Sequence, residues 1–442
     1  MDRWLAGTLI MLTGALPLGG CGRSGAPDPA TARGRMALAE LPGLRASADQ
    51  GLQAELALTQ QQQGLPLQLA PAEVSRTAAG SKPKSIEQLQ RAFPPLSRGL
   101  VRGPLDGVYR GGPLNFSPVQ LERSRELVRK HAAACKQFRA ALPVQPGGYG
   151  LRLCDGTLAD LSFLEPLDLG CRLESVAAAV LLADNLPDDA VPHLATLLTT
   201  ARVLAAEPNV TTRVAAANIR GDALHVLAAI AGHDRCTAEM HQRLFDLLSE
   251  QTADWPADSH AWIGDRAAGM LTYELVREGH YLSLLAADEV AQLQSQQVAL
   301  VTAQAAVRNI DADERFYLQA IRQLIDASQQ PFFERRDILA QLRRSLHEKE
   351  QSSDYPLVAG KLLLADFETA QRRQAEDFAR CQAWMLALGT ALGHEVPAAA
   401  NPLTGSPYSL ERTPLLVKVT AVLPDRDEPC LVPLPPPRAA RR

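Results

Sequence analysis

The stretch Leu194 to Ala205 (LATLLTTARVLA) decides the fold of this chain. Its apolar residues recur at intervals of three and four residues, which places them along one face of an α-helix. Such a face is buried against a neighbouring element, so the stretch predicts a helix in the core of the protein. The residues of this face are Leu194, Leu197, Leu198, Ala201, Leu204 and Ala205.

The same helical periodicity extends over about residues 160–285. Pro187 and Pro208 separate successive helices, because proline is tolerated in the first turn of a helix but not in its interior. Gly232 stands at a position typical of a helix C-terminus. Helices joined by short turns pack against their neighbours. The chain is therefore expected to be mostly α, as an irregular α-solenoid or a multi-helix array with a small C-terminal β-hairpin.

The segments on either side of this core differ in character. Residues 36–116 are expected to hold an N-terminal helix followed by an irregular region rich in proline and glycine. A helical body is expected over residues 117–395, beginning with Ser117-Pro118 as N-cap and first helical residue. The last helix of this body is expected to run from Pro356 toward Gly393.

Residues 396–424 are expected to form the small β-hairpin, packed on the last helix. Residues 415–423 (LLVKVTAVL) alternate in the manner of a strand, and Asn401 to Tyr408 (NPLTGSPY) precedes them as a turn. This turn resembles the DPxTGxPxxY-type ending of uncharacterised, mostly helical bacterial envelope proteins, with Asn401 in place of their aspartate. The resemblance implies no activity. Residues 425–442 are expected to be an exposed, proline-rich tail.

Composition limits the possible functions. The chain has 442 residues and a formal net charge of −4, with acidic and basic residues interleaved. A nucleic-acid-binding surface needs a basic face with aromatic platforms, so no nucleic-acid partner is expected. Aromatic residues make up only 5% of the chain, which also disfavours sugar binding. The sequence has neither the GxSxG of serine hydrolases nor the GxxxxGK[ST] of phosphate-binding loops, and no cofactor is expected.

The start of the chain predicts where the protein resides. Arg3 precedes a short apolar run that ends in Leu18-Gly19-Gly20-Cys21. The run is shorter than the roughly 20 apolar residues of a membrane-spanning helix and is typical of a cleaved secretory signal. Its last four residues resemble the lipobox of bacterial lipoproteins. The resemblance implies that the leader, residues 1–20, is removed and that Cys21 is acylated.

An acylated Cys21 would anchor the protein to the membrane. The protein is then expected to be exported and held at the bacterial cell envelope, in the outer membrane facing the periplasm if the cell is Gram-negative. Residues 21–35 are rich in glycine, alanine and proline and are expected to be a flexible tether. An ordinary signal peptide with an incidental cysteine is the alternative.

The remaining cysteines are open to two interpretations. The chain has seven cysteines in all, and an exported compartment permits disulfides. Cys381 with Cys430, and Cys154 with Cys135 or Cys171, are candidate pairs, but sequence spacing does not select a connectivity. Buried, reduced cysteines are the alternative. The spacing does not suggest a metal site, since no CxxC motif is present.

The most polar candidate site lies in the stretch from Trp255 to Gly269 and the helix that follows. His260, Asp265, Arg266 and Glu274 are its members, and His260 and Glu274 are expected to have acid/base roles if they face a cleft. Asp265 and Glu274 are nine residues apart and are expected to share one helix face.

The structural alternative for this stretch is a helix that Asp258 or Ser259 caps and that runs to about Glu278. In it, Asp265 and Arg266 form a buried ion pair, and small residues let a second helix approach closely. The small residues are Gly264, Ala267, Ala268 and Gly269.

Two functions of different class follow, and the balance of the sequence is against an enzyme. The first is a lipid-anchored helical adaptor or scaffold of the cell envelope with an envelope protein as partner. It predicts an exposed groove or apolar patch. The second is an envelope hydrolase with its site around His260, which requires His260, an acid and a third polar group to meet in a pocket. Binding of a small apolar ligand between helices is a further alternative.

Overall fold

The computed structural model describes residues 49–61, 84–109, 116–145, 148–151, 161–285, 287–350, 352, 354–396, 400–425 and 428–434. The predicted fold class is confirmed: these residues are mostly α-helical, with a small antiparallel sheet near the C-terminus. The predicted leader, Cys21, the tether, Cys154 and the end of the proline-rich tail lie outside the described residues.

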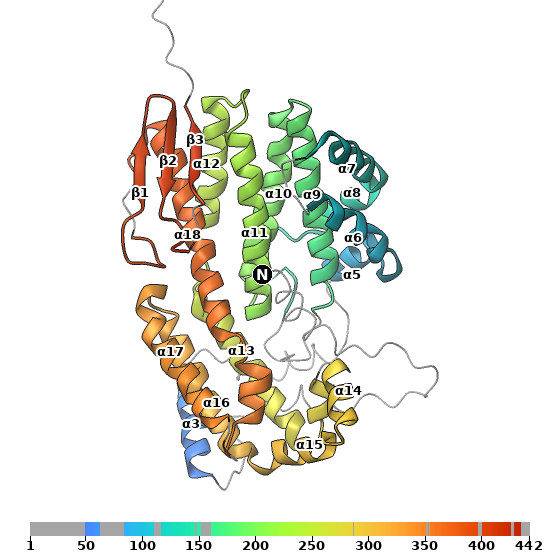
Figure 1. The fold of residues 1–442 in the computed structure, drawn as a ribbon, viewed down its shortest axis with the longest axis vertical. Helices are drawn as coiled ribbons and strands as arrows, with labels where there is room; N and C mark the ends of the chain where they lie inside the picture. Colours follow the sequence, from blue (N-terminus) through green and yellow to red (C-terminus); the bar gives the residue numbers. More distant parts are fainter. Residues whose placement is uncertain are drawn as a thin grey trace, which may run out of the picture.

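Four helices stand side by side in one half of the molecule (Figure 1). They are α9 (Leu164–Ala183), α10 (Pro187–Ala205), α11 (Val210–Ala231) and α12 (Ala238–Ala253). The predicted face Leu194 to Ala205 is fully buried on α10, which packs against both α9 and α11. Pro187 is the first residue of α10, and Gly232 is the C-cap of α11, as predicted.

Among the described helices, α11 is the one that is long enough and apolar enough to cross a membrane. It packs against α9, α10 and α18 inside the protein. Its length and composition are therefore those of a core helix.

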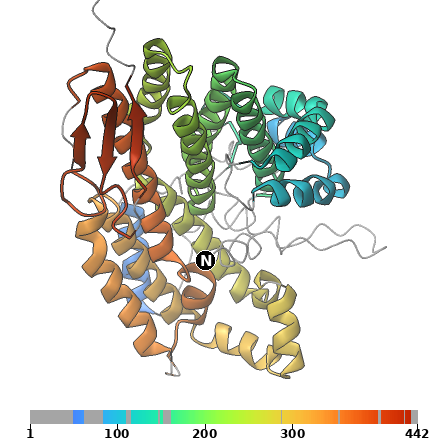
Figure 2. The same cartoon turned by 45° about the horizontal axis from the view of Figure 1, so that its top comes forward.

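Four shorter helices cover the outer side of α9 (Figures 1 and 2). They are α5 (Lys84–Ala92), α6 (Pro95–Tyr109), α7 (Pro118–Lys130) and α8 (Ala132–Ala141). Ser117 caps α7 as predicted, and Gln120 reciprocates from the third helical residue in a capping box.

The prediction of an irregular region before Ser117 is wrong for α6. This helix forms despite Pro104 and three glycines because Val101, Leu105 and Val108 lie on one face and are buried. Tertiary burial of this face overrides the weak helix propensity of glycine and proline.

The other half of the molecule is built from later helices and one early one. It contains α13 (Asp258–Arg277), the 3₁₀ turn η2 (Tyr281–Leu284), α16 (Ile310–Ala327) and α17 (Phe332–Lys349). The short helices α14 (Ala287–Ser295) and α15 (Ala299–Arg308) form its tip (Figure 1). Helix α3 (Gln50–Gln61), inside the predicted N-terminal helix, packs on α16.

Helix α18 (Phe367–Leu392) runs along both halves and joins them (Figure 1). It packs against α11, α12, α17 and the sheet. The prediction that it starts at Pro356 is wrong, because a separate π-helical turn, η3 (Ala359–Leu363), precedes it. A solenoid repeat contacts only its neighbours. The long-range contacts of α18 therefore make the fold a multi-helix array.

The C-terminal sheet has three strands in the order β1 (Ser409–Arg412), β2 (Leu416–Thr420) and β3 (Cys430–Pro433). Both pairs are antiparallel, with Val417 opposite Arg412 on one side and Val432 on the other. The predicted hairpin exists and packs on α18. The prediction that residues 425–442 are only an exposed tail is wrong, because β3 lies within them and its Cys430 and Val432 are buried.

Asn401 organises the turn before this sheet. Its Nδ2 donates hydrogen bonds to the carbonyl oxygens of Ala421 (2.8 Å) and Val422 (2.9 Å), and its Oδ1 accepts one from the backbone N–H of Leu403 (2.9 Å). An ionised aspartate cannot donate, so the asparagine fits a position at which two carbonyl oxygens need a donor.

A buried arginine network as the candidate functional site

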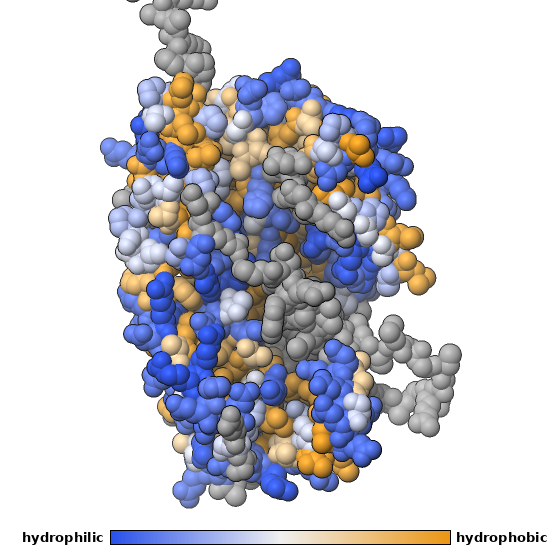
Figure 3. Space-filling view, viewed as in Figure 1, coloured by the Kyte–Doolittle hydropathy of each residue, from blue (hydrophilic) through white to orange (hydrophobic). Residues whose placement is uncertain are grey.

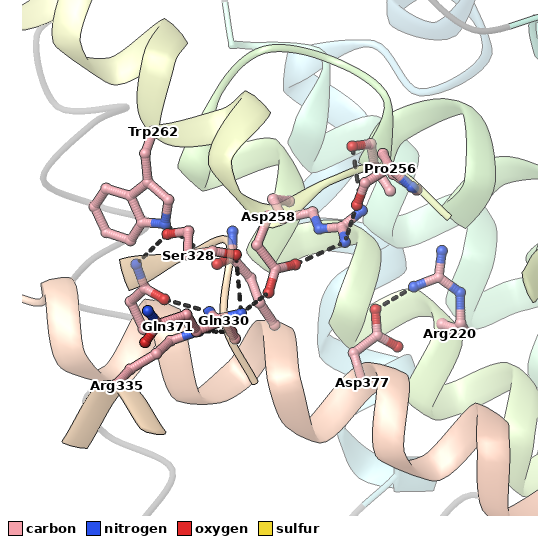
Figure 4. A network of polar contacts seen from close by, with 12 residues as sticks. Arg220, Pro256, Asp258, Trp262, Ser328, Gln330, Arg335, Gln371 and Asp377 are labelled. Carbon is pink, nitrogen blue, oxygen red and sulfur yellow. Dashed lines mark hydrogen bonds and ion pairs between the residues drawn. The ribbon is translucent and has the colours of Figure 1, made fainter. Parts of the chain in front are cut away.

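Two arginines of α11 form the start of a buried ionic network (Figure 4). Arg213 and Arg220 are about two helical turns apart and therefore share one face of the helix. Each is only 1% exposed. Both guanidinium groups lie over the ring of Trp255, at 5.1 Å and 4.5 Å from its centroid, in cation–π geometry. Phe378 of α18 packs against the same ring.

Asp258 connects this helix to α17. Its Oδ1 accepts a hydrogen bond from Arg213 (3.1 Å) and its Oδ2 accepts one from Arg335 (3.0 Å). Arg213 also donates to the carbonyl oxygen of Pro256 at 3.0 Å. The expectation that Asp258 is a helix cap is wrong: Ala257 is the N-cap of α13, and the Asp258 carboxylate bonds to two arginines instead.

Helix α18 supplies the facing residues from successive turns (Figure 4). Asp377 pairs with Arg220, and Gln371 accepts a hydrogen bond from Arg335. Gln371 also donates to the Oγ of Ser328, the C-cap residue of α16, at 2.6 Å. The network therefore connects α11, α13, α16, α17 and α18, the helices at the junction of the two halves.

Burial dominates the electrostatics of this network. It lowers the pKa of Arg213, an effect that the nearby Asp258 carboxylate opposes. It raises the pKa of Asp377, which Arg220 and Arg213 oppose. Removing charges from water is costly unless each one is paired, and each of these groups faces a group of opposite charge that opposes the effect of burial on its pKa. The geometry describes a joint between helices, with its charges directed at one another.

The residues predicted to form a polar cluster do not meet. His260 is exposed near the start of α13. Glu274 accepts a hydrogen bond from Arg277 at 3.0 Å on the last turns of the same helix. The expectation that Asp265 and Glu274 share a face is wrong, because nine residues at about 100° each place them on opposite sides of a helix.

Asp265 has a structural partner in place of the predicted Arg266 ion pair. Its Oδ1 accepts hydrogen bonds from the backbone N–H of Val210 (3.0 Å) and from Asn209 Nδ2 (3.3 Å), at the N-terminus of α11. A carboxylate is favourable there because the first N–H groups of a helix are unpaired and its dipole is positive. Burial nevertheless raises the pKa of Asp265 to about 7.

The side chain of Arg266 lies near other residues than the side chain of Asp265, its predicted partner. It is 2% exposed, and burial lowers its pKa while Tyr317 and Asp326 of α16 oppose that shift. The expected close approach of helices is confirmed at Gly269, where a Cβ atom would lie 2.2 Å from Tyr317 Oη. The absence of that atom lets Tyr317 donate a hydrogen bond to the Asp265 carbonyl oxygen at 2.8 Å.

A second buried polar group escaped sequence analysis because its residues come from three helices. Glu174 of α9 is fully buried and accepts two hydrogen bonds from Arg139 (2.8 and 2.9 Å). His193 Nδ1 lies 2.6 Å from the same carboxylate. Burial raises the pKa of Glu174, but the hydrogen bonds from His193 and Arg139 outweigh it and bring the pKa below its usual value.

A histidine oriented by a carboxylate is one component of a catalytic site, and a nucleophile is another. The nearby thiol, Cys135, has its pKa raised to about 11 by burial and by the Glu174 charge. It is thus kept as the unreactive thiol rather than the nucleophilic thiolate. This group is therefore another ionic contact between helices.

The cysteines and the metal-binding residue types form no further site among the described residues. Cys381 and Cys430 are both free and buried, so of the two alternatives left open by the sequence the structure has the reduced thiols. Among the described residues, no group of three or more His, Cys, Asp or Glu side chains is arranged to hold a metal ion.

Comparison with known proteins gives no further assignment. No family model, curated protein or solved structure matches the chain.

Proposed function

We propose that this protein is a lipid-anchored helical adaptor or scaffold of the bacterial cell envelope. The observation that carries the proposal is the apolar surface of α15. Leu300 and Val301 of this helix are 69% and 64% exposed, and Val307 on the same helix is also exposed. In Figure 3 hydrophobic surface lies at the lower right, over the tip formed by α14 and α15.

Packing within the protein does not account for the apolar side chains of this tip. None of the residues of α14 is buried, and Ala306 is the only buried residue of α15. The large apolar side chains of α15 are therefore exposed on a segment that buries few residues. Apolar surface of this kind is typical of a protein-binding site.

The buried ionic network supports the same function. It bonds the helices of one half to those of the other through charged pairs that are costly to separate. A scaffold needs such fixed relative positions, because a partner-binding surface loses affinity when its geometry must be ordered on binding.

The alternative of a hydrolase around His260 has no geometric support. His260 is exposed, Asp265 is bonded to the N-terminus of α11, and Glu274 is paired with Arg277. The acid/base role required these groups to converge, so the adaptor is the better proposal.

In-cell photocrosslinking tests the proposal. A photoreactive residue replaces Val301 on α15, and in a matched control it replaces the exposed Glu239 on α12. We expect a discrete crosslinked envelope protein from position 301, absent from position 239, and reduced in Cys21→Ser, which lacks the predicted acylation site. Equal, diffuse crosslinking at both positions would contradict the adaptor, and an unchanged membrane fraction in Cys21→Ser would contradict the anchor.

A further inference from the structure

The buried side chain of Arg266 on α13 is in direct contact with no group of opposite charge. It is 2% exposed, and its Nε is enclosed without a hydrogen-bond partner. Within the part of the chain that the structure describes, its terminal guanidinium nitrogens form no hydrogen bond or ion pair either. The other buried arginines among these residues each pair with an aspartate; they are Arg213, Arg220 and Arg335. Arg266 differs from them in that no direct contact neutralises its charge.

The charge of Arg266 persists inside the protein. Burial lowers its pKa, and the charge of Arg322 on α16 lowers it further, while Tyr317 and Asp326 of the same helix raise it. A guanidinium group nevertheless keeps its proton in proteins, because its ordinary pKa is so high. An enclosed charge without a partner is costly, so a group of opposite charge is needed to compensate for it.

The side chains of α16 that act on Arg266 do not supply this group. Tyr317 already donates its hydroxyl proton to a carbonyl oxygen of α13. Asp326 is exposed and, among the described residues, forms no ion pair with either arginine. Arg322 is a second cation, which donates to Glu55 at 3.1 Å through one of its nitrogens and has further N–H groups. The surroundings of Arg266 therefore combine two guanidinium groups with a single exposed carboxylate that neither of them binds.

We propose that a small monovalent anion, of the size of chloride, binds beside the guanidinium group of Arg266, with Arg322 as the second cation of the site. The charge of Arg266 requires an anionic occupant, and the enclosure of its side chain limits the size of that occupant. Asp326 repels the anion, so the loss of its charge should strengthen binding. The bound anion would stabilise the packing of α13 on α16.

This inference goes beyond the proposed function and does not rest on it. The first test is thermal unfolding of the full chain in mixtures of sodium chloride and sodium gluconate at constant ionic strength. We expect the unfolding temperature to rise with chloride and to level off, as it does when a ligand binds the folded state. Arg266→Gln should lose this response, whereas the matched control Arg308→Gln, which removes an exposed positive charge from α15, should keep it. Circular dichroism shows whether each variant is folded. No chloride response in the native chain, or an equal response in folded Arg266→Gln, would overturn the proposal.

Asp326→Asn distinguishes an anion site from an arginine with only a structural role, and it leaves Arg266 in place. We expect it to lower the chloride concentration of half-maximal stabilisation about fivefold, because a nearby negative charge no longer opposes the anion. Asp246→Asn, at an exposed position of α12, is the matched control and should leave that concentration unchanged. If Arg266 depended on Asp326 instead of an anion, Asp326→Asn would lower the unfolding temperature at every chloride concentration without shifting the half-maximal one. That result would overturn the proposal.

Discussion

The carboxylate of Asp265 on α13 accepts a hydrogen bond from the backbone N–H of Val210, the first residue of α11. One helix thereby supplies an acceptor to the unpaired N-terminus of another. Because this carboxyl is enclosed, its pKa is raised to about 7. The contact therefore depends on pH within the range in which proteins are usually handled.

We predict that the protein loses stability as pH rises from about 4 to about 7. The folded chain binds a proton at Asp265 in this range while the unfolded chain, with an ordinary aspartate pKa of about 3.9, does not, so deprotonation favours unfolding. Burial raises the pKa of Asp222 to about 7 and of Glu207 to about 6, which acts in the same direction. Urea unfolding at pH 5 and pH 8 measures the difference.

Asp265→Asn should reduce this pH dependence by about 1–3 kcal/mol, because asparagine keeps the acceptor for Val210 without a charge to bury. A variant as pH-dependent as the native chain would show that Asp265 is not responsible.

The pair of Arg220 and Asp377 predicts a non-additive response. Arg220→Met leaves the buried Asp377 carboxylate without its main partner and should destabilise the fold by about 3–5 kcal/mol. Removing both charges in Arg220→Met with Asp377→Leu should recover most of that loss, since no uncompensated charge remains. A double-mutant cycle in urea gives the coupling. Additive losses would show that the two charges do not stabilise each other.

Gly269 predicts a steric conflict with the ring of Tyr317. Gly269→Ala places a Cβ atom 2.2 Å from Tyr317 Oη and should cost about 1–3 kcal/mol. Adding Tyr317→Phe removes the oxygen but leaves the ring carbons Cζ and Cε1 at 2.3 Å and 2.5 Å from the added Cβ, so it should recover little of the loss. Gly221→Ala on α11 is the matched control: its Cβ meets nothing within 4 Å, so it should stabilise by about 0.5–1 kcal/mol. Thermal unfolding of the variants measures these changes in stability. Equal effects at both glycines would refute the packing argument.

The two C-terminal cysteines should behave as buried thiols. Burial raises the pKa of Cys381 to about 12 and raises the pKa of Cys430 further. We expect neither to react with iodoacetamide at pH 8 until the chain is unfolded, as read by mass spectrometry of labelled peptides. A reductant should leave the melting temperature unchanged. A drop equivalent to about 2–5 kcal/mol on reduction would instead reveal the disulfide that the sequence left open.

The helices that the sequence predicted well are those with local signals. Ser117 and Gln120 lie three residues apart and cap α7 by themselves, and the face from Leu194 to Ala205 repeats within one helix. Helix α6 was missed because its glycines and Pro104 are unfavourable locally, and only burial of Val101, Leu105 and Val108 against neighbouring helices compensates for them.

The polar contacts could not be predicted in the same way. Sequence analysis singled out Asp265 and Arg266 because they are adjacent, but on a helix adjacent side chains diverge by about 100° and each finds its partner on a different helix. The arginines of the network, Arg213 and Arg220, gave no signal because a charged residue in a helical pattern is usually solvent-exposed.

By itself, the sequence determined the mostly helical fold class, the start of α7, the start of α10, the end of α11 and the small C-terminal sheet. Each of these follows from side-chain spacing and capping within a few residues of the chain. Only the tertiary structure decided that Arg220 pairs with Asp377, 157 residues away, and that Asp258 joins Arg213 to Arg335. A buried charge is stable only where packing brings an opposite charge within hydrogen-bond distance, and packing is a property of the assembled helices.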